Sequence, residues 1–179
     1  TRNGLFIAAS SGTLNLGGNS FLGPIGHDGI SIGNLGGTHH INGNTFSAVL
    51  HDGLFVGEGT GSLNLSENQF LGPIGHDGIS IHNLQPIEGS TAIGNNTIGR
   101  AGERIGRVGL LMTESNGSIS LTGNTITGCD AEGIVVQNVS SGSLTISGNT
   151  ITNAHTAGVL LLQIGVAVAL ESNLLEGTL

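Results

Sequence analysis

The sequence predicts an all-β fold in which one repeated unit winds into a single-domain solenoid of about seven turns. Residues 19–32 return almost unchanged at residues 68–81, and residues 51–56 are a weaker copy of residues 27–32. The true period is therefore 24–25 residues. Apolar residues also alternate with a period of two, which is typical of short strands. A fixed period in this range indicates a solenoid, because each unit buries its apolar face only against its neighbours.

Each unit has two anchors, a glycine and an asparagine. The glycine opens a short apolar run, at Gly4, Gly29, Gly53, Gly78, Gly109, Gly133 and Gly158. The asparagine follows 15 to 18 residues later, at Asn19, Asn44, Asn68, Asn96, Asn124, Asn149 and Asn173. Only the fourth unit departs from this spacing, with about three extra residues on each side of Asn96. We therefore expect one domain over residues 1–179, with an irregular fourth turn at residues 84–108.

The alternation places the strands relative to the anchors. The first strand follows the glycine, and its inward pairs are Leu5/Ile7, Ile30/Ile32, Leu54/Val56, Ile79/Ile81, Leu110/Met112, Ile134/Val136 and Val159/Leu161. A second apolar position lies three residues before the asparagine, and a third lies two residues after it. Each turn is thus predicted to contain two or three short strands separated by glycine-rich corners.

The repeated asparagines are interpreted as structural residues. A side-chain amide both donates and accepts hydrogen bonds, so identical asparagines one turn apart can bond in a ladder along the axis. Asparagine also tolerates the left-handed backbone of a tight corner. We expect these residues to shape the turn and not to form a site.

Two solenoid folds fit the period. Residues 63–70 satisfy the leucine-rich repeat pattern, but that fold also needs regular leucines on its return path. Here the return path carries a second strand pattern in every turn. The later turns, such as residues 133–151, resemble the repeats of right-handed parallel β-helix proteins, which include pectate lyases, alginate epimerases and many surface adhesins. The resemblance implies a right-handed parallel β-helix, with the leucine-rich repeat as the alternative, and it specifies fold and not chemistry.

Composition excludes several kinds of partner. The chain has no lysine, tyrosine or tryptophan, and four arginines oppose twelve carboxylates for a net charge of -8. Nucleic acids and anionic membranes require a basic surface, so neither is expected as a partner. No apolar run reaches the length that crosses a bilayer. The richness in Gly, Asn, Ser and Thr suggests an extracellular or cell-surface protein of bacterial origin. The single cysteine, Cys129, excludes an internal disulfide and is expected to be a buried or half-buried thiol.

Neither end of the sequence shows a capping segment. The first unit begins within three residues of Thr1, and Leu174 and Leu175 still follow the repeat. Open solenoid ends pair with whatever offers a matching edge. We therefore expect axial stacking on other copies, or flanking coils of a longer chain from which this segment is cut.

Three His-Asp pairs precede the opening glycines of consecutive units: His27-Asp28, His51-Asp52 and His76-Asp77. Stacked turns would align the carboxylates and imidazoles in columns with a spacing of about 4.8 Å. Like charges that close raise one another's pKa unless a cation offsets them. Ca²⁺ would use oxygen ligands, whereas a transition metal would prefer the imidazoles. The alternative is that each aspartate accepts N–H bonds in its own turn and each histidine is solvated.

The fourth unit concentrates basic residues, with Arg100, Glu103, Arg104 and Arg107 in one bulge. The resemblance to β-helix lyases and epimerases implies a base beside an arginine in a groove. Asp77 or His76 would then be the base, and Arg104 or Arg107 would stabilise the resulting anion. The chain lacks an aromatic platform for a sugar, and the alternative is an ion-paired surface loop.

An outward position in the first strand is apolar in five of the seven units, at Phe6, Phe55, Leu111, Val135 and Leu160. An apolar strip on the surface predicts a contact with a neighbouring rod, a partner or another part of the chain. The alternative is that a loop such as residues 84–91 covers it.

Together these patterns favour a non-enzymatic structural or adhesive rod, either a segment of a longer surface protein or a self-associating filament subunit. The alternative is a polysaccharide lyase or epimerase with a carbohydrate substrate. A third possibility is a metal-binding rod that holds Ca²⁺ or a transition metal in the His and Asp columns.

Overall fold

The computed structural model describes residues 2–87 and 89–177, which form one continuous stack of seven coils with three strands each. Sheet A contains β1 (Leu5–Ser10), β4 (Ile30–Leu35), β7 (Leu54–Gly59), β10 (Ile79–His82), β13 (Leu110–Thr113), β16 (Ile134–Val139) and β19 (Val159–Ile164). Sheet B contains β2 (Leu14–Gly17), β5 (Thr38–Asn42), β8 (Ser62–Ser66), β11 (Ser90–Gly94), β14 (Gly117–Thr122), β17 (Gly142–Ser147) and β20 (Ala167–Glu171). Sheet C contains β3 (Ser20–Phe21), β6 (Thr45–Phe46), β9 (Gln69–Phe70), β12 (Thr97–Ile98), β15 (Thr125–Thr127), β18 (Thr150–Thr152) and β21 (Leu174–Glu176).

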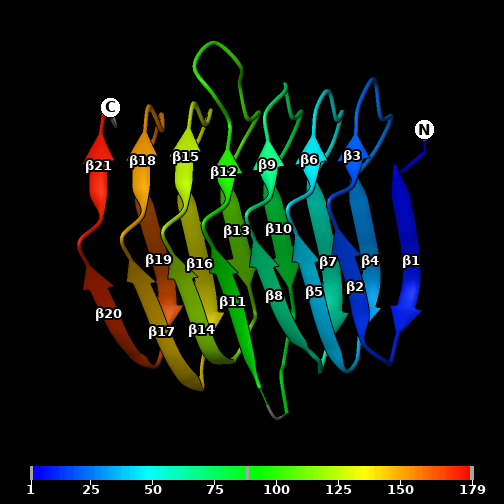
Figure 1. Cartoon of the computed structure of the whole chain (residues 1–179). Coiled ribbons are helices and arrows are strands. Elements are labelled where there is room, and N and C mark those ends of the chain that lie inside the picture. The colour runs from blue at the N-terminus through cyan, green and yellow to red at the C-terminus, as the bar shows by residue number, and fades with distance from the viewer. Residues whose placement is uncertain (1, 88, 178–179) are drawn as a thin grey trace.

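All strand pairs within the three sheets are parallel, and each strand bonds to the equivalent strand one coil away. The coils therefore lie side by side along one axis, and the two ends of the chain lie at opposite ends of the stack (Figure 1). The return path carries strands in every coil, so the leucine-rich repeat alternative is wrong. Within the described residues, nothing forms a helix long and apolar enough to cross a membrane.

The core is a column of inward side chains that follows the predicted period of two. In sheet A the partners Ile30, Leu54 and Ile79 are all fully buried. Sheet C adds stacked phenylalanine rings, whose centroids are 4.9 Å apart for Phe21 and Phe46 and 4.6 Å apart for Phe46 and Phe70. A further column lies at the corner before sheet A and consists of Ile25, Val49, Ile74, Ile105 and Cys129. Cys129 is buried, as expected.

The anchor asparagines form the predicted ladder at the corner between sheets B and C. The Nδ2 group of Asn44 donates to Oδ1 of Asn68 over 3.0 Å, and Asn68 donates in the same way to Asn96. The main-chain N–H of each asparagine donates to the same oxygen in the next coil. The second Nδ2 hydrogen of Asn68 bonds to the carbonyl of Ile41 over 2.7 Å. A fully buried amide is thus satisfied at both ends, which removes the cost of burying it.

The left-handed residue of this corner lies one position earlier than the sequence suggested. A positive φ occurs at the residue before each ladder asparagine, namely Gly18, Gly43, Glu67, Asn95, Gly123, Gly148 and Ser172. Four of these are glycines, which adopt this conformation without steric cost. The residue before each ladder asparagine therefore makes the tight corner, and the asparagine itself contributes the hydrogen bonds between coils.

The fourth coil is irregular because two loops interrupt it. One loop connects β10 to β11, and the other connects β12 to β13 and projects beyond the other corners (Figure 1). In the second loop the main chain of Glu103 bonds back to Arg100 over 3.1 Å. The strands on either side keep their register, since Ile79 pairs with Leu110 across the second loop.

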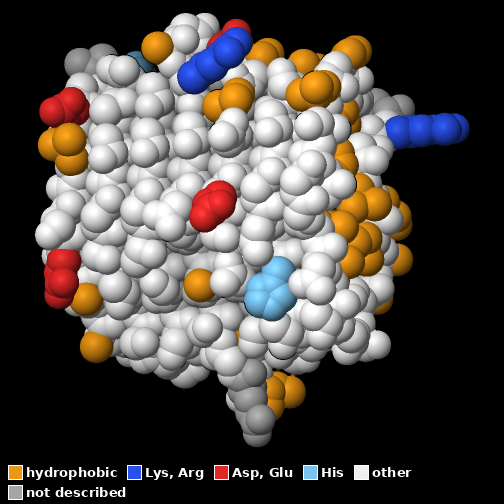
Figure 2. Space-filling model, in the orientation of Figure 1, with side chains coloured by type: hydrophobic (Ala, Val, Ile, Leu, Met, Phe, Trp, Pro, Cys, Tyr) orange, Lys and Arg blue, Asp and Glu red, His pale blue; other side chains and the backbone are white. Residues whose placement is uncertain are grey.

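Both ends of the core column are open among the described residues. Leu170 and Leu175 are 55% and 47% exposed, whereas their partners one coil back, Ile146 and Ile151, are fully buried. At the other end, the inward residues of β1 and β2 are only partly buried. Figure 2 shows hydrophobic side chains gathered at this N-terminal end, and few charged side chains on the sheet face turned to the viewer.

Candidate functional site

The three aspartates of the His-Asp pairs form a buried column at the corner that leads into sheet A. Asp28, Asp52 and Asp77 are at most 2% exposed. Oδ1 of Asp52 accepts the main-chain N–H of Asp77 over 2.9 Å, and Oδ1 of Asp28 accepts that of Asp52 over 3.3 Å. The aspartates therefore accept N–H bonds, but the donors belong to the next coil and not to the turn of the aspartate itself. Each carboxylate ties two coils together.

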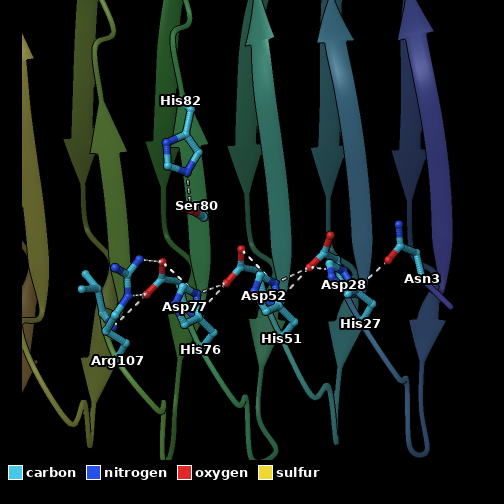
Figure 3. Close-up of polar contacts among 11 residues, drawn as sticks. Asn3, His27, Asp28, His51, Asp52, His76, Asp77, Ser80, His82 and Arg107 are labelled. Carbon is cyan, nitrogen blue, oxygen red and sulfur yellow. Dashed lines mark hydrogen bonds and ion pairs between the residues drawn. The ribbon is translucent and has the colours of Figure 1, made fainter. Parts of the chain in front are cut away.

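The three histidines stack outside this column. The ring centroids of His27 and His51 are 4.5 Å apart, and those of His51 and His76 are 4.7 Å apart. Nδ1 of His51 lies 2.8 Å from Oδ1 of Asp28, and Nδ1 of His76 lies 2.8 Å from Oδ1 of Asp52. The imidazole side chains are 38–49% exposed. Figure 3 shows the rings side by side, with His51 and His76 next to the carboxylate of the coil before and His27 next to Asp28 of its own coil. We call residues 27, 28, 51, 52, 76 and 77 the His-Asp column.

A different residue closes each end of the column (Figure 3). Before Asp28, the side chain of Asn3 accepts the main-chain N–H of Asp28 over 3.1 Å. After Asp77, Arg107 occupies the position that histidine occupies in the earlier coils. Its Nε donates to Oδ1 of Asp77 over 2.9 Å, and its Nη2 donates to Oδ2. The main-chain N–H of Val108 adds a third bond to Asp77 over 3.0 Å.

Electrostatics differ along the column. Burial raises the pKa of the Asp52 carboxyl, and the nearby Asp77 charge adds to this effect. Hydrogen bonds from the Asp77 main chain and the His76 ring act in the opposite direction. The hydrogen bond to Asp77 raises the pKa of Arg107, so this cation is permanent. Arg107 bonds directly to Asp77, whereas the basic side chains that bond to Asp28 and Asp52 are imidazoles.

Two overlapping groups within the column have donor atoms close enough to hold a metal ion. They consist of His27, Asp28 and His51, and of His51, Asp52 and His76, with all donor atoms of each group within 4.8 Å of one another. Each group offers two imidazoles and one carboxylate. This donor set suits a transition metal, because Ca²⁺ takes six to eight oxygen ligands.

The candidate catalytic residues are only partly brought together. His76, Asp77 and Arg107 are neighbours, but Arg104 pairs with Asp130 and is 74% exposed. The carboxylate of Asp77 is fully buried and is held by Arg107 and Val108. A group in this state positions an arginine and is poorly placed to take a proton from a substrate. Arg100 and Glu103 form the ion pair expected of a surface loop, at 3.1 Å.

The apolar strip runs along the outer face of sheet A. Phe6 is 63% exposed, whereas Leu111 and Val135 are only 7% and 5% exposed. Val108, Ala131 and Leu160 pack around these two residues and cover them. The strip is therefore less exposed than the sequence suggested, and its later part forms the apolar floor of a groove of about 480 Å³. The groove also has polar walls, which include Arg107, Glu132 and Gln137.

Sequence reasoning did not find His82, which also lines this groove. Its Nε2 lies 2.9 Å from Oγ of Ser80, its Nδ1 lies 2.8 Å from Oγ1 of Thr113, and its ring contacts Phe55. Ser80 is only 1% exposed, so the Ser-His pair is closed to a substrate. The repeat pattern does not single out this histidine, because the equivalent position holds a different type of residue in most other coils.

The stacked coils, the three parallel sheets and the internal ladders define a parallel β-solenoid. The family model for the right-handed β-helix region matches residues 3–175. The chain therefore belongs to the right-handed β-helix family, which confirms the predicted fold and its handedness. Comparisons with curated proteins and with solved structures give no match.

Proposed function

We propose that the protein is a structural rod whose stack continues at its ends, either onto further copies of this chain or onto flanking coils of a longer polypeptide, and we argue the first arrangement below. The polar residues that could have carried chemistry are largely used to hold coils together. Asp77 is bonded by Arg107 and Val108, and the ladder asparagines bond to one another. Because these polar side chains bond to other coils of the same chain, we favour a structural role over a catalytic one.

The observation that carries the proposal is the complementarity of the two ends. Within the chain, each ladder asparagine donates its main-chain N–H and Nδ2 to Oδ1 of the asparagine in the following coil. At the last coil Nδ2 of Asn173 donates to the carbonyl of Ile146 over 2.8 Å, which leaves its second Nδ2 hydrogen and its main-chain N–H without an acceptor among the described residues. At the first coil Oδ1 of Asn19 meets no donor among the described residues. Stacking a second copy on the C-terminal end would continue the same ladder.

The apolar surfaces of the two ends match in the same way. Leu170 and Leu175 are the exposed core positions at one end, and Leu16 and Phe21 occupy the equivalent columns at the other. Because Leu170 and Leu175 are already about half buried, completing their burial would stabilise an interface by about 1 kcal/mol each. Because the two surfaces differ, the contact is head-to-tail and does not close, so it produces a filament.

Sedimentation velocity over a range of concentrations tests this proposal. We expect the wild-type chain to grow in mass with concentration, and Leu170→Asp to remain a monomer, because the charge would be buried in the axial contact. The matched control is Leu162→Asp, on the outer face of sheet A, where the leucine is 43% exposed. Growth that is lost in Leu162→Asp and kept in Leu170→Asp would indicate lateral contact, and a monomer at every concentration would refute self-association.

We further place this rod outside the cell or on the cell surface of a bacterium, where it would act as a scaffold or adhesin. The composition supports this location, since the chain lacks lysine and is rich in small polar residues. Antibody labelling of intact source cells tests it. Labelling that appears only after the cells are opened would contradict it.

The groove on sheet A supports a second candidate function, which is the binding or cleavage of an acidic polysaccharide. Its walls carry Arg107, Glu132 and His82 above an apolar floor. Incubation with polyuronates tests this function, with unsaturated product or epimerised residues as the readout. Activity that disappears in Glu132→Gln would favour the lyase or epimerase. A chain that neither binds nor converts polyuronates would contradict this second function.

A further inference from the structure

The His-Asp column pairs its aspartates with two kinds of basic residue, an arginine at one step and histidines at the others. In three successive steps, the basic residue of one coil lies next to the aspartate of the coil before it. At the last step this residue is Arg107, a permanent cation on Asp77. At the two earlier steps it is His51 on Asp28 and His76 on Asp52. An imidazole contributes positive charge at these steps only by binding a proton or by holding a cation at its ring nitrogen.

The donor atoms at these two steps are close together. Nδ1 of His27 and Nδ1 of His51 lie 3.0 Å and 2.8 Å from Oδ1 of Asp28. In the next group, Nδ1 of His51 and Nδ1 of His76 lie 3.4 Å and 2.8 Å from the carboxylate oxygens of Asp52. Donor atoms separated by about 3 Å fit around an ion whose bonds to nitrogen and oxygen are about 2.0–2.2 Å.

We propose that the His-Asp column binds one zinc-type transition-metal ion per chain through two imidazoles and one carboxylate. The half-exposed rings leave a coordination position open to water and provide a path of entry. The carboxylates are held in place by main-chain N–H groups of the next coil, as in metal sites whose ligands are oriented by outer hydrogen bonds.

The geometry also sets the number of ions. Both groups use His51, and the contacts of both involve its Nδ1. Because one nitrogen lone pair binds one ion, a metal ion bound in one group uses Nδ1 of His51 and prevents binding in the other group. His51 is therefore required, whereas His27 and His76 can each be replaced without loss of the remaining group.

Calorimetric titration of the chelator-treated chain with Zn²⁺ tests the proposal, and Co²⁺ absorption in the visible range reports the ligands directly. We expect one equivalent of Zn²⁺ in the wild type and about one equivalent in His27→Gln and in His76→Gln. His51→Gln should bind at least about tenfold more weakly and lose the Co²⁺ absorption. Ca²⁺ should give no binding, because each group offers a single carboxylate.

His155→Gln is the control for adventitious coordination, since His155 is an exposed histidine outside the column. Circular dichroism checks that each variant keeps its strands. The double variant His27→Gln with His76→Gln should lose Zn²⁺ binding as His51→Gln does, because neither group then keeps two imidazoles. Zn²⁺ binding that is unchanged in His51→Gln, or lost in His155→Gln, would overturn the proposal. So would a wild-type chain that binds no Zn²⁺. None of these outcomes depends on whether the rods stack end to end.

Discussion

At the scale of single residues, buried polar groups are tolerated because each has partners one coil away. Asn68 is fully buried and bonds to Asn44, Asn96 and Ile41. Asp52 is almost as deeply buried, but it carries charge, and its partners offset the cost only in part. Amide and carboxylate columns therefore contribute differently to stability.

Asn68→Ala should lower the free energy of unfolding by about 3 kcal/mol, because donors and acceptors on three neighbours would lose their partner. The matched control is Asn64→Ala in the same coil, where the asparagine points outward and is half-buried. We expect a change within about 0.5 kcal/mol for the control. Urea unfolding measures both, and equal effects would contradict the ladder.

Asp52→Asn should change how stability depends on pH. The raised pKa means that the folded chain binds this proton more tightly than the unfolded chain, whose ordinary pKa is 3.8. The contribution of Asp52 is thus fully present below that value and is lost as pH rises through the raised pKa. Relative to wild type, the variant should gain stability between pH 4 and pH 7.

The measurement is the difference in free energy of unfolding between variant and wild type, with a chelator present. A difference that stays constant or reverses between the two pH values would show that burial does not dominate at Asp52.

Cys129 should be unreactive in the folded protein. Burial raises the pKa of its thiol to about 12, so almost none is thiolate at neutral pH. A thiol reagent should label it rapidly in urea and very slowly without urea. Rapid labelling in the native state would mean that this corner of the core opens.

At the scale of elements, the corner before sheet A depends on glycine because two coils meet there closely. A Cβ at Gly53 would lie 2.4 Å from the ring of Phe70 and 2.6 Å from the carbonyl oxygen of Gly78. The backbone oxygen cannot move without disturbing the next coil. Hence the glycine that opens each first strand is required by packing.

Gly53→Ala should lower the free energy of unfolding by about 1–3 kcal/mol. The matched control is Gly12→Ala, where a Cβ would meet nothing within 4 Å. Thermal melts of the two variants measure the contrast. A Gly53→Ala chain as stable as the control would mean that the coils separate more easily than the structure indicates.

The sequence predicted the strands and columns well, because a fixed period and inward alternation determine which residues stack. It placed Asp77 beside the arginines of the irregular coil without deciding between Arg104 and Arg107, and the structure shows the contact for Arg107, while Arg104 pairs with Asp130. It overestimated the exposure of Leu111, because burial there depends on neighbours such as Val108 and Ala131 from the corners. It missed His82 because its contacts with Ser80 and Thr113 arise at a position that does not repeat.

At the scale of the whole molecule, one polarity runs through the stack from the first coil to the last. The ladder asparagines of the first six coils each donate to the asparagine of the following coil, and the core columns remain open at the first and seventh coils. The two end surfaces are complementary to each other and not to themselves, so the proposed self-association would add copies head to tail and would not form a closed dimer.

Cross-linking across the proposed axial contact tests this polarity most directly. Asn15 and Ala169 occupy the same outward column in the first and last strands of sheet B. In a chain with Asn15→Cys and Ala169→Cys, stacked copies would bring the two positions about 4.8 Å apart, within the range for a disulfide. Cys129 is buried and can remain. Mild oxidation should give a series of covalent oligomers, whereas Asn15→Cys with Leu162→Cys should not. Monomers alone from the first pair, or an equal series from both, would contradict end-to-end stacking in register.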